Sequence, residues 1–211
     1  MSSSDFDDFL TDAKLHIKTT GRVDDFSDYH MYPYEASSYS VLDRLAQSGW
    51  IRNTDHLLDY GCGKARTLVY LHDKTGCRAT GVEVMQSLYD AGCENIALYD
   101  KNVCAPHGKH CNIDLVCTQA QIYDIPASVN RIFFFNPFSV EIFKSVMKRV
   151  IDAYYDNPGQ ILMFLYYPQD EYVAYLSRLD EVMFEDEIDC TDLFPEKDSR
   201  NRIMIYSVGE E

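Results

Sequence analysis

Short apolar runs alternate with amphipathic stretches along most of the chain. The apolar runs predict strands at residues 57–59, 78–82, 113–117, 131–135 and 161–167. The stretches between them repeat apolar residues at helical spacing, and they predict helices beginning at 67, at 86–98 and at 140–155. An alternation of strands and helices is typical of a parallel sheet that is covered by helices on both faces.

The end of the chain departs from this alternation. Residues 183–190 and 202–208 alternate apolar and polar positions, and the connector between them, around 192–198, contains no full helix. These two runs predict an antiparallel pair of strands. The expected fold class is therefore α/β, a doubly wound Rossmann-like sheet of seven strands, mostly parallel, with a C-terminal antiparallel hairpin.

Residues 1–50 precede the first predicted strand, and we expect them to form a helical or lid segment. Phe6, Phe9 and Leu10 fall on one side of a predicted helix, and residues 40–46 predict a second helix. Between these helices, residues 29–34 are dense in aromatic side chains, which indicate either core packing or a cover over a bound ligand. No linker follows, so residues 51–211 are expected to complete a single Rossmann-like domain.

A glycine-rich turn follows the first predicted strand and precedes a predicted helix. Asp59 ends the strand, and Gly61 and Gly63 flank Cys62. Glycine permits positive φ and lets a ligand lie against the backbone. The free N–H groups at the start of the next helix point to the same place. This turn predicts a nucleotide-type site at the carboxyl end of the first strand.

An acidic residue ends the second predicted strand. Glu83 lies 24 residues after Asp59, which is the length of one strand–helix–strand unit. A carboxylate at this position can accept hydrogen bonds from both hydroxyls of a ribose. The combination of a glycine turn and a distant acid is a much stronger signal than either part alone.

Two classes of cofactor use such an arrangement, and the spacing of small residues separates them. The dinucleotide fingerprint G-x-G-x-x-G/A would place Arg66 at its third small position, where it is too bulky for close helix–strand packing. The alternative pattern D-x-G-x-G-x-G/A is satisfied by Asp59, Gly61, Gly63 and Ala65. With these residues the chain resembles the class I S-adenosylmethionine-dependent methyltransferases.

The resemblance covers roughly residues 34–208, judged by the order of elements, and it implies S-adenosylmethionine as the cofactor. The cofactor-binding residues that it implies are Asp59, Gly61, Cys62, Gly63, Glu83, Gln119, Ala120 and Asn136. In the family, residues after the third strand hold the adenine, usually through an acid, and Gln119 and Ala120 stand there in this chain. A glutamine carbonyl can accept from the adenine amine as an acid would, and an ordinary loop amide is an equally good interpretation of Gln119.

A second chemical motif ends the fourth predicted strand. Asn136, Pro137 and Phe138 resemble the N-P-P-F/Y motif of methyltransferases that modify amine and amide nitrogens, although the second proline is missing. The resemblance implies that Asn136 and the Pro137 carbonyl accept hydrogen bonds from the target amine, while Phe138 packs on a planar substrate. These three are the predicted catalytic residues. The alternative interpretation is a strand-end turn followed by a helix cap at Ser139.

Composition narrows the expected partners and compartment. A formal net charge of −15 disfavours nucleic acid and anionic membrane surfaces as partners. The seven cysteines form no C-x-x-C pair, and the cluster of Cys and His at 104–111 has no common zinc spacing, so no metal is expected. Free thiols in this number predict a cytoplasmic location. The apolar runs are too short to span a bilayer.

Together these features predict that residues 51–211 form a methyltransferase domain. The expected reaction transfers a methyl group from S-adenosylmethionine to a small-molecule or protein acceptor, with an amine or amide nitrogen as the target. Two alternatives stay open: an S-adenosylmethionine-binding module without transferase activity, and a nicotinamide-dependent oxidoreductase. The missing second proline favours the first alternative, whereas Arg66 argues against the second.

Overall fold

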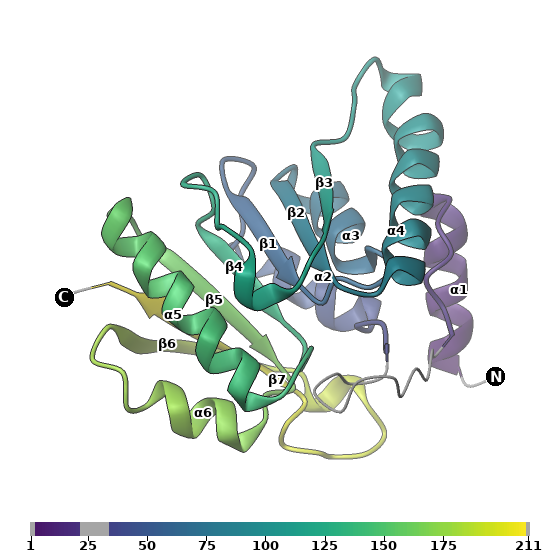
Figure 1. Cartoon of the computed structure of the whole chain (residues 1–211). Coiled ribbons are helices and arrows are strands. Elements are labelled where there is room, and N and C mark those ends of the chain that lie inside the picture. Colours follow the sequence, from purple (N-terminus) through teal and green to yellow (C-terminus); the bar gives the residue numbers. More distant parts are fainter. Residues whose placement is uncertain (1–2, 22–33, 210–211) are drawn as a thin grey trace.

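The computed structural model describes residues 3–21 and 34–209, and it shows a seven-stranded sheet between two layers of helices (Figure 1). The strands are β1 His56–Tyr60, β2 Arg78–Glu83, β3 Ile113–Cys117, β4 Arg131–Phe134, β5 Ile161–Tyr166, β6 Val182–Asp189 and β7 Arg202–Val208. Their order in the sheet is β3-β2-β1-β4-β5-β7-β6. Strands β1 to β5 are parallel, and β7 pairs antiparallel with both β5 and β6. The predicted fold class is confirmed.

Six α-helices connect or precede these strands in the described part of the chain. They are α1 Ser3–Leu15, α2 Tyr39–Gln47, α3 Arg66–Thr75, α4 Gln86–Tyr99, α5 Val140–Asp156 and α6 Asp170–Leu176. A π-helical turn, Asp100–Cys104, and a 3-10 turn, Ala105–His107, prolong α4 where the sequence predicted only a polar loop. The Asp100 carboxylate accepts hydrogen bonds from the Cys111 N–H at 2.6 Å and from His110, and these bonds close the segment into a compact turn.

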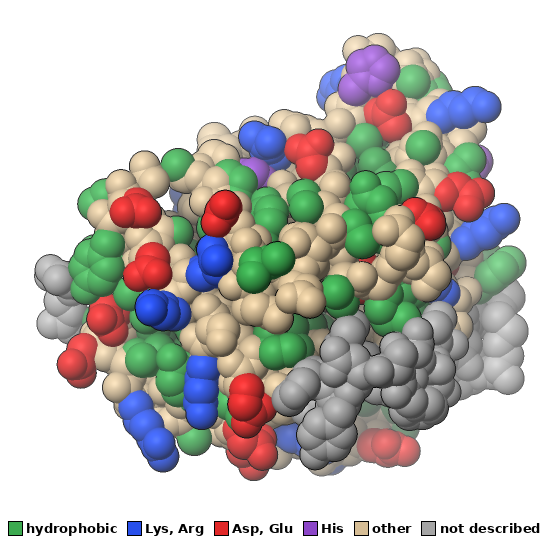
Figure 2. Space-filling model, viewed as in Figure 1, with side chains coloured by type: hydrophobic (Ala, Val, Ile, Leu, Met, Phe, Trp, Pro, Cys, Tyr) green, Lys and Arg blue, Asp and Glu red, His purple; other side chains and the backbone are tan. Residues whose placement is uncertain are grey.

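Successive residues of each strand point to opposite faces of the sheet, which divides the core into two layers. Leu57 packs with residues of α2 and α3, whereas Leu58 packs with residues of α5 and α6. Phe133 and Phe134 on β4 divide in the same way. Both faces are therefore apolar, which explains why the parallel strands appear as continuous apolar runs in the sequence. Figure 2 shows the outer surface on the α5 and α6 side, where charged side chains of both signs are interspersed with apolar ones.

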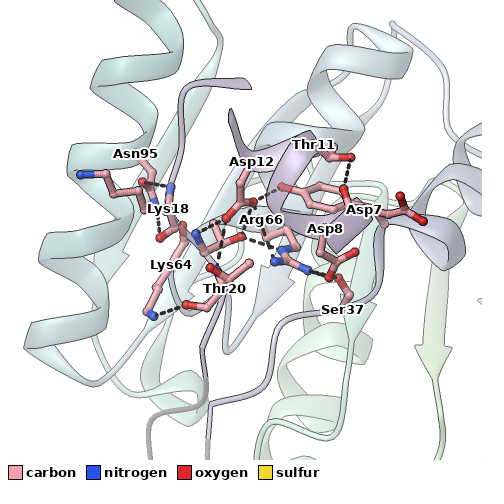
Figure 3. A network of polar contacts seen from close by, with 12 residues as sticks. Asp7, Asp8, Thr11, Asp12, Lys18, Thr20, Ser37, Lys64, Arg66 and Asn95 are labelled. Carbon is pink, nitrogen blue, oxygen red and sulfur yellow. Dashed lines mark hydrogen bonds and ion pairs between the residues drawn. The ribbon is translucent and has the colours of Figure 1, made fainter. Parts of the chain in front are cut away.

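A buried polar network joins α1 to the beginning of α3 (Figure 3). Arg66 donates from Nε to Thr19 Oγ1 at 2.6 Å and from Nη1 to Asp8 Oδ2 at 2.5 Å. Its guanidinium group lies 3.8 Å from Asp12 and 4.4 Å from the centre of the Tyr39 ring. Only 3% of Arg66 is exposed, so these partners compensate a charge that would be costly to bury alone.

Two apolar residues of α1 are largely exposed, whereas two others at the end of the segment are buried. Phe9 and Leu10 are 52% and 50% exposed, whereas Leu15 and Ile17 at the end of the segment are 3% exposed. Phe9 and Leu10 therefore contribute little to the core, and the side chain of Phe6 lies outside the described residues. The helix is held instead by its charged partners and by the chain that leaves its C-terminal end.

The sequence also raised expectations about thiols, metal ions and membrane spans. The seven cysteines are all free thiols. Within residues 3–21 and 34–209, no three His, Cys, Asp or Glu side chains are arranged to hold a metal ion. No helix of the same residues is long and apolar enough to cross a membrane.

His56, at the start of β1, should make stability depend on pH. Its ring nitrogens lie 2.8 Å from Ser128 Oγ and Thr80 Oγ1, and burial lowers its pKa to about 4, with Arg78 adding to the effect. Between pH 6.5 and 4, His56 is protonated in the unfolded chain but stays neutral in the folded protein. Acid therefore lowers the free energy of unfolding over that range. We expect a loss of about 1–3 kcal/mol in the free energy of unfolding.

Urea unfolding of the parent and of His56→Gln at pH 7, 5.5 and 4.5 measures this contribution. The difference between the two proteins isolates His56, because the other titrating groups are common to both. His107→Gln replaces an exposed histidine and serves as the control, with the slope of the parent expected. An unchanged slope in His56→Gln would show that this histidine does not carry the acid sensitivity.

Candidate cofactor and acceptor site

A cavity of about 810 Å³ lies where the strand order of the sheet reverses. Strand β1 lies between β2 and β4, so the connection that leaves β1 runs to one side, toward β2, and the connection that leaves β4 runs to the other side, toward β5. Open α/β sheets bind ligands in the crevice formed at such a switch point. The cavity wall includes residues that follow β1, β2, β3, β4 and β5, together with the connector between β6 and β7.

The structure brings most of the predicted site residues together in this wall. The predicted residues that line the cavity are Gly61, Glu83, Gln119, Ala120, Asn136, Pro137 and Phe138. Asp59 and Cys62 instead line an adjoining hollow of about 30 Å³. Gly63 lines neither space, although it belongs to the same turn. Of the two glycines in the turn, only Gly61 lines the large cavity, and Asp59 lies in the wall of the small adjoining hollow.

Gly61 brings the ends of β1 and β4 into contact. Its φ is +72°, and a Cβ at this position would lie 2.4 Å from the Cβ of Pro137. Its N–H and that of Cys62 donate to the Val82 carbonyl at 2.8 and 3.2 Å, which ties the turn to β2. Only glycine combines this left-handed backbone with so close a neighbour. The first motif and the Asn136–Pro137 motif are thus packed directly against each other.

Tyr34 covers the second glycine of the turn. Gly63 has a φ of +53°, and a Cβ there would lie 2.2 Å from Cε2 of the Tyr34 ring. The Tyr34 hydroxyl donates to the Thr19 carbonyl at 3.0 Å, and Lys64 Nζ lies 4.9 Å from the ring centre. Burial raises the pKa of Tyr34. Tyr34 belongs to the aromatic stretch found in the sequence, of which residues 29–33 lie outside the described residues.

Glu83 both braces the glycine turn and lines the cavity. Its carboxylate accepts three backbone hydrogen bonds, from Gly63 at 2.9 Å, Val84 at 2.9 Å and Met85 at 2.8 Å. Burial raises the pKa of Glu83, and these three bonds oppose that effect. A carboxylate offers about four lone-pair sites, so the side chain retains capacity for a ligand hydroxyl. Sequence reasoning predicted the position of this acid but not its second task.

Asp59 is buried behind the turn. It is 4% exposed, and burial raises its pKa well above the usual value, with the charge of Glu83 adding to the effect. A hydrogen bond with Thr67, in the first turn of α3, opposes this rise. Asp59 therefore connects the end of β1 to the start of α3, and any effect that it has on a ligand passes through the turn.

The wall expected to hold an adenine is formed by residues after β2 and β3. Gln119 is exposed and its Oε1 accepts a hydrogen bond from Gln121 Nε2 at 3.2 Å, while Ala120 is 8% exposed and begins a 3-10 turn. Met85 and Leu88 supply apolar surface to the same cavity. A flat heterocycle could thus be held between apolar side chains and an amide at its edge.

Asn136 occupies a strained position at the end of β4. Its φ is +43°, and Tyr167 at the end of β5 has a φ of +51°. The Asn136 Nδ2 group donates to the Tyr167 carbonyl at 2.5 Å, which fixes the amide. Among the described residues, none donates a hydrogen bond to its Oδ1. Non-glycine residues in this conformation are uncommon and concentrate at ligand sites.

The ring of Phe138 is held mainly in the core. The residue is 5% exposed, and its ring packs edge-on against Tyr60 and Phe134, with centroids 6.4 and 6.5 Å apart. Its carbonyl accepts a hydrogen bond from the Tyr172 hydroxyl. Phe135 and Tyr166, whose ring centroids are 4.6 Å apart, also line the cavity. Sequence reasoning singled out neither ring as a site residue, since both belong to apolar strand runs.

The connector between β6 and β7 forms a wall that sequence reasoning did not include. Tyr167 donates from its hydroxyl to Asp198 at 2.6 Å, and Arg200 Nη2 donates to the same carboxylate at 2.9 Å. The Arg200 guanidinium lies 4.5 Å from the centre of the Tyr167 ring. These hydrogen bonds, first that of Arg200, lower the pKa of Asp198. The antiparallel hairpin was the available signal, because it returns this connector to the carboxyl edge of the sheet.

Comparison with known proteins supports a methyltransferase fold. No protein-family model matches the chain. An rRNA methylase from Streptococcus thermophilus has a TM-score of 0.52 at 11% identity, covering 84% of this chain and 98% of that one. An RNA methyltransferase from Salinibacter ruber, crystallised with S-adenosyl-L-homocysteine, has a TM-score of 0.52 at 15% identity, covering 84% and 95%. The chain thus has the fold of S-adenosylmethionine-dependent methyltransferases, which confirms the resemblance at the level of the fold.

One segment of the chain is also similar in sequence to a methyltransferase. Over 68 residues the chain is 34% identical to a histone-lysine N-methyltransferase specific for lysine 79 of H3, from Dictyostelium discoideum. The match covers 32% of this chain and 4% of the length of that protein. It is therefore a similarity of one segment, and the chain spans a small part of this relative.

The dinucleotide fingerprint requires a small residue at its third position, where helix and strand pack closely, and this chain has Arg66 there. Arg66 fills this position with a buried guanidinium group that is committed to Asp8 and Thr19. It lies on the wall of the small hollow and is not among the residues that line the large cavity. Neither this geometry nor the comparisons give support to a nicotinamide cofactor.

Proposed function

We propose that this protein transfers a methyl group from S-adenosylmethionine to a nitrogen of its acceptor. The observation that carries the proposal is the meeting of Gly61, Glu83 and Asn136 in the wall of a single cavity at the switch point of the sheet. The first two residues fit a nucleoside-type cofactor, and the third fits an acceptor. The similarity in fold to an rRNA methylase and to an RNA methyltransferase supports the same assignment.

The residues around the cavity fit the cofactor. Gly61 offers bare backbone, since a side chain at this position would collide with Pro137. Glu83 is placed to accept from ribose hydroxyls with the carboxylate capacity that its three backbone donors leave. Gln119 and Ala120 line the part expected to take the adenine. When bound, S-adenosylmethionine supplies a methyl group already activated by the sulfonium.

Asn136 would orient the acceptor nitrogen. Its amide N–H group is committed to the Tyr167 carbonyl, so Oδ1 is the atom that remains to accept from an N–H of the acceptor. The Pro137 carbonyl is a second candidate acceptor, because Pro137 lies in the same wall. Holding two N–H groups in this way aims the nitrogen lone pair at the methyl carbon, and such alignment accelerates a reaction without a dedicated general base.

Titration calorimetry with S-adenosyl-L-homocysteine and with NAD tests the cofactor. We expect the first ligand to bind at least about 100-fold more tightly, a difference of roughly 2.7 kcal/mol. Tighter binding of NAD would favour an oxidoreductase instead. Transfer of labelled methyl from S-adenosylmethionine to small amines, amides and cell extract then tests catalysis. Cofactor binding without methyl transfer to any acceptor would favour the alternative that the protein is a binding module without transferase activity.

A further inference from the structure

We propose that the acceptor is a cationic aliphatic amine, protonated when free in solution, on a lysine side chain or a small polyamine. The inference rests on the methyl transfer proposed above and names the substrate class of the same cavity. It is carried by the charges and the ring surfaces that line the cavity together with Asn136. The exocyclic amine of a nucleobase fits this wall poorly, because it is neutral and belongs to a nucleic acid whose backbone carries phosphate groups.

The charged groups of the wall are predominantly carboxylates. The acidic residues among the described residues that line the cavity are Glu35, Glu83, Glu196 and Asp198. Glu83 is committed to the glycine turn, whereas Glu35 and Glu196 are exposed, so their carboxylates lie at the open side of the cavity. Glu35 and Tyr166 line the same cavity, and the charge of Glu35 adds to the effect of burial in raising the pKa of Tyr166.

The single cation of the described wall is already neutralised. Arg200 binds Asp198 through Nη2 at 2.9 Å and through Nε at 3.3 Å, and its guanidinium lies over the Tyr167 ring. It is therefore committed on one side to a carboxylate and on the other to an aromatic face. An acceptor that carries phosphate groups would meet the unpaired charges of Glu35 and Glu196 without a free positive partner among these residues.

Aromatic rings supply the second part of the recognition. Besides Phe138, which is held in the core, the rings that line the cavity are Tyr34, Phe135, Tyr166, Tyr167 and Phe194. An ammonium group within about 6 Å of such ring faces is attracted by their quadrupoles. An apolar methylene chain also packs favourably along rings of this kind. Rings and carboxylates together fit an alkylammonium ion better than an anion or a neutral base.

The reaction requires that the ammonium group lose a proton before it attacks. The proton passes to water at the open side of the cavity, next to Glu35 and Glu196. The nitrogen lone pair then forms the N–C bond while the S–C bond of the sulfonium breaks, and its electron pair stays on sulfur. The products are the methylated ammonium, once one proton has been released overall, and neutral S-adenosylhomocysteine.

The test compares three acceptors with labelled S-adenosylmethionine. The probes are a peptide of alternating lysine and glycine, a linear diamine of five carbons, and a single-stranded RNA oligonucleotide. We expect methylation of the peptide or the diamine, which distinguishes the two sources of the amine, and none of the RNA. Methylation of the RNA alone would overturn the inference and leave the proposed methyl transfer intact. Methylation of neither amine, with the cofactor bound, would also overturn it.

A double variant, Glu35→Gln with Glu196→Gln, tests the carboxylates themselves. We expect KM for the amine to rise at least about tenfold, equivalent to 1.4 kcal/mol, with the affinity for S-adenosylhomocysteine within about twofold of the parent. The matched control, Glu171→Gln with Glu185→Gln, removes two exposed acids outside the cavity and should keep the parent KM. Equal KM values for the two double variants would overturn the role of the acidic wall. If the parent protein itself did not bind S-adenosylhomocysteine, that result would instead contradict the proposed function.

Discussion

Replacing Asn136 with alanine should slow methyl transfer by one to several orders of magnitude while the affinity for S-adenosyl-L-homocysteine stays nearly unchanged. The side chain lines the cavity, its amide N–H is fixed on the Tyr167 carbonyl at 2.5 Å, and its oxygen is left for the acceptor. Loss of an aligning contact lowers the rate because the reacting atoms are no longer held in line. The rate is measured with the best acceptor found in the three-probe comparison.

The competing interpretation is that Asn136 only shapes a strand-end turn. Its φ of +43° makes this plausible in part, since alanine tolerates the left-handed region less well than asparagine. That interpretation predicts a lower melting temperature and little specific change in rate. Asn112→Ala, which truncates an exposed asparagine outside the cavity, is the matched control. A folded Asn136→Ala protein that works at the parent rate would show that Asn136 does not position the acceptor.

The architecture could be predicted because the burial of each parallel strand determines which of its residues are apolar. Pairs such as Leu57 and Leu58 pack on opposite faces of the sheet, so the parallel strands are apolar without interruption. Burial does not alternate in the terminal hairpin, because β7 is buried along most of its length while the edge strand β6 is largely exposed, so the alternation expected there is wrong. Along the parallel strands, burial on both faces matches the apolar runs. Periodicity reports such burial directly, which is why the order and type of these elements were correct.

The arrangement of the site depended on contacts between distant parts of the chain, and local patterns do not encode these. Tyr34 covers Gly63, and Tyr167 binds Asp198 across the β6–β7 connector. No periodicity or motif spacing in the sequence indicates either pairing. The same limit applies to α1, where helical spacing suggested packing of Phe9, and the buried Arg66 network decided the docking instead.

The assignment of the domains stays a prediction of the sequence, but the packing indicates how closely the first fifty residues depend on the rest. Leu15 and Ile17 belong to the same core cluster as Leu57 and Leu68. The backbone of Lys18 exchanges hydrogen bonds with the Asn95 side chain on α4, at 2.8 and 3.3 Å. The described residues of 3–21 are therefore fixed to the core and to helices α3 and α4.

Replacing Glu83 with alanine should weaken binding of S-adenosyl-L-homocysteine by roughly 1–3 kcal/mol, or about 5- to 150-fold, because ligand hydroxyls lose a charged acceptor. Calorimetric titration of the purified variant measures this change. The carboxylate also accepts from the backbone of Gly63, Val84 and Met85, so its loss would free three donors and loosen the turn. Part of the lost affinity would then reflect disorder of the site in the free protein.

Glu83→Gln separates the two contributions. Its amide retains an oxygen for the Val84 and Met85 donors but presents an N–H₂ group to Gly63 or to the ligand, so it keeps the size of the side chain and removes the charge. If ligand contact dominates, both variants lose affinity while Glu83→Gln unfolds near the parent temperature. If the turn dominates, Glu83→Ala alone loses affinity and stability together. Glu94→Ala, on the exposed side of α4, controls for the change in net charge. Parent-like affinity in both folded Glu83 variants would remove Glu83 from the cofactor site.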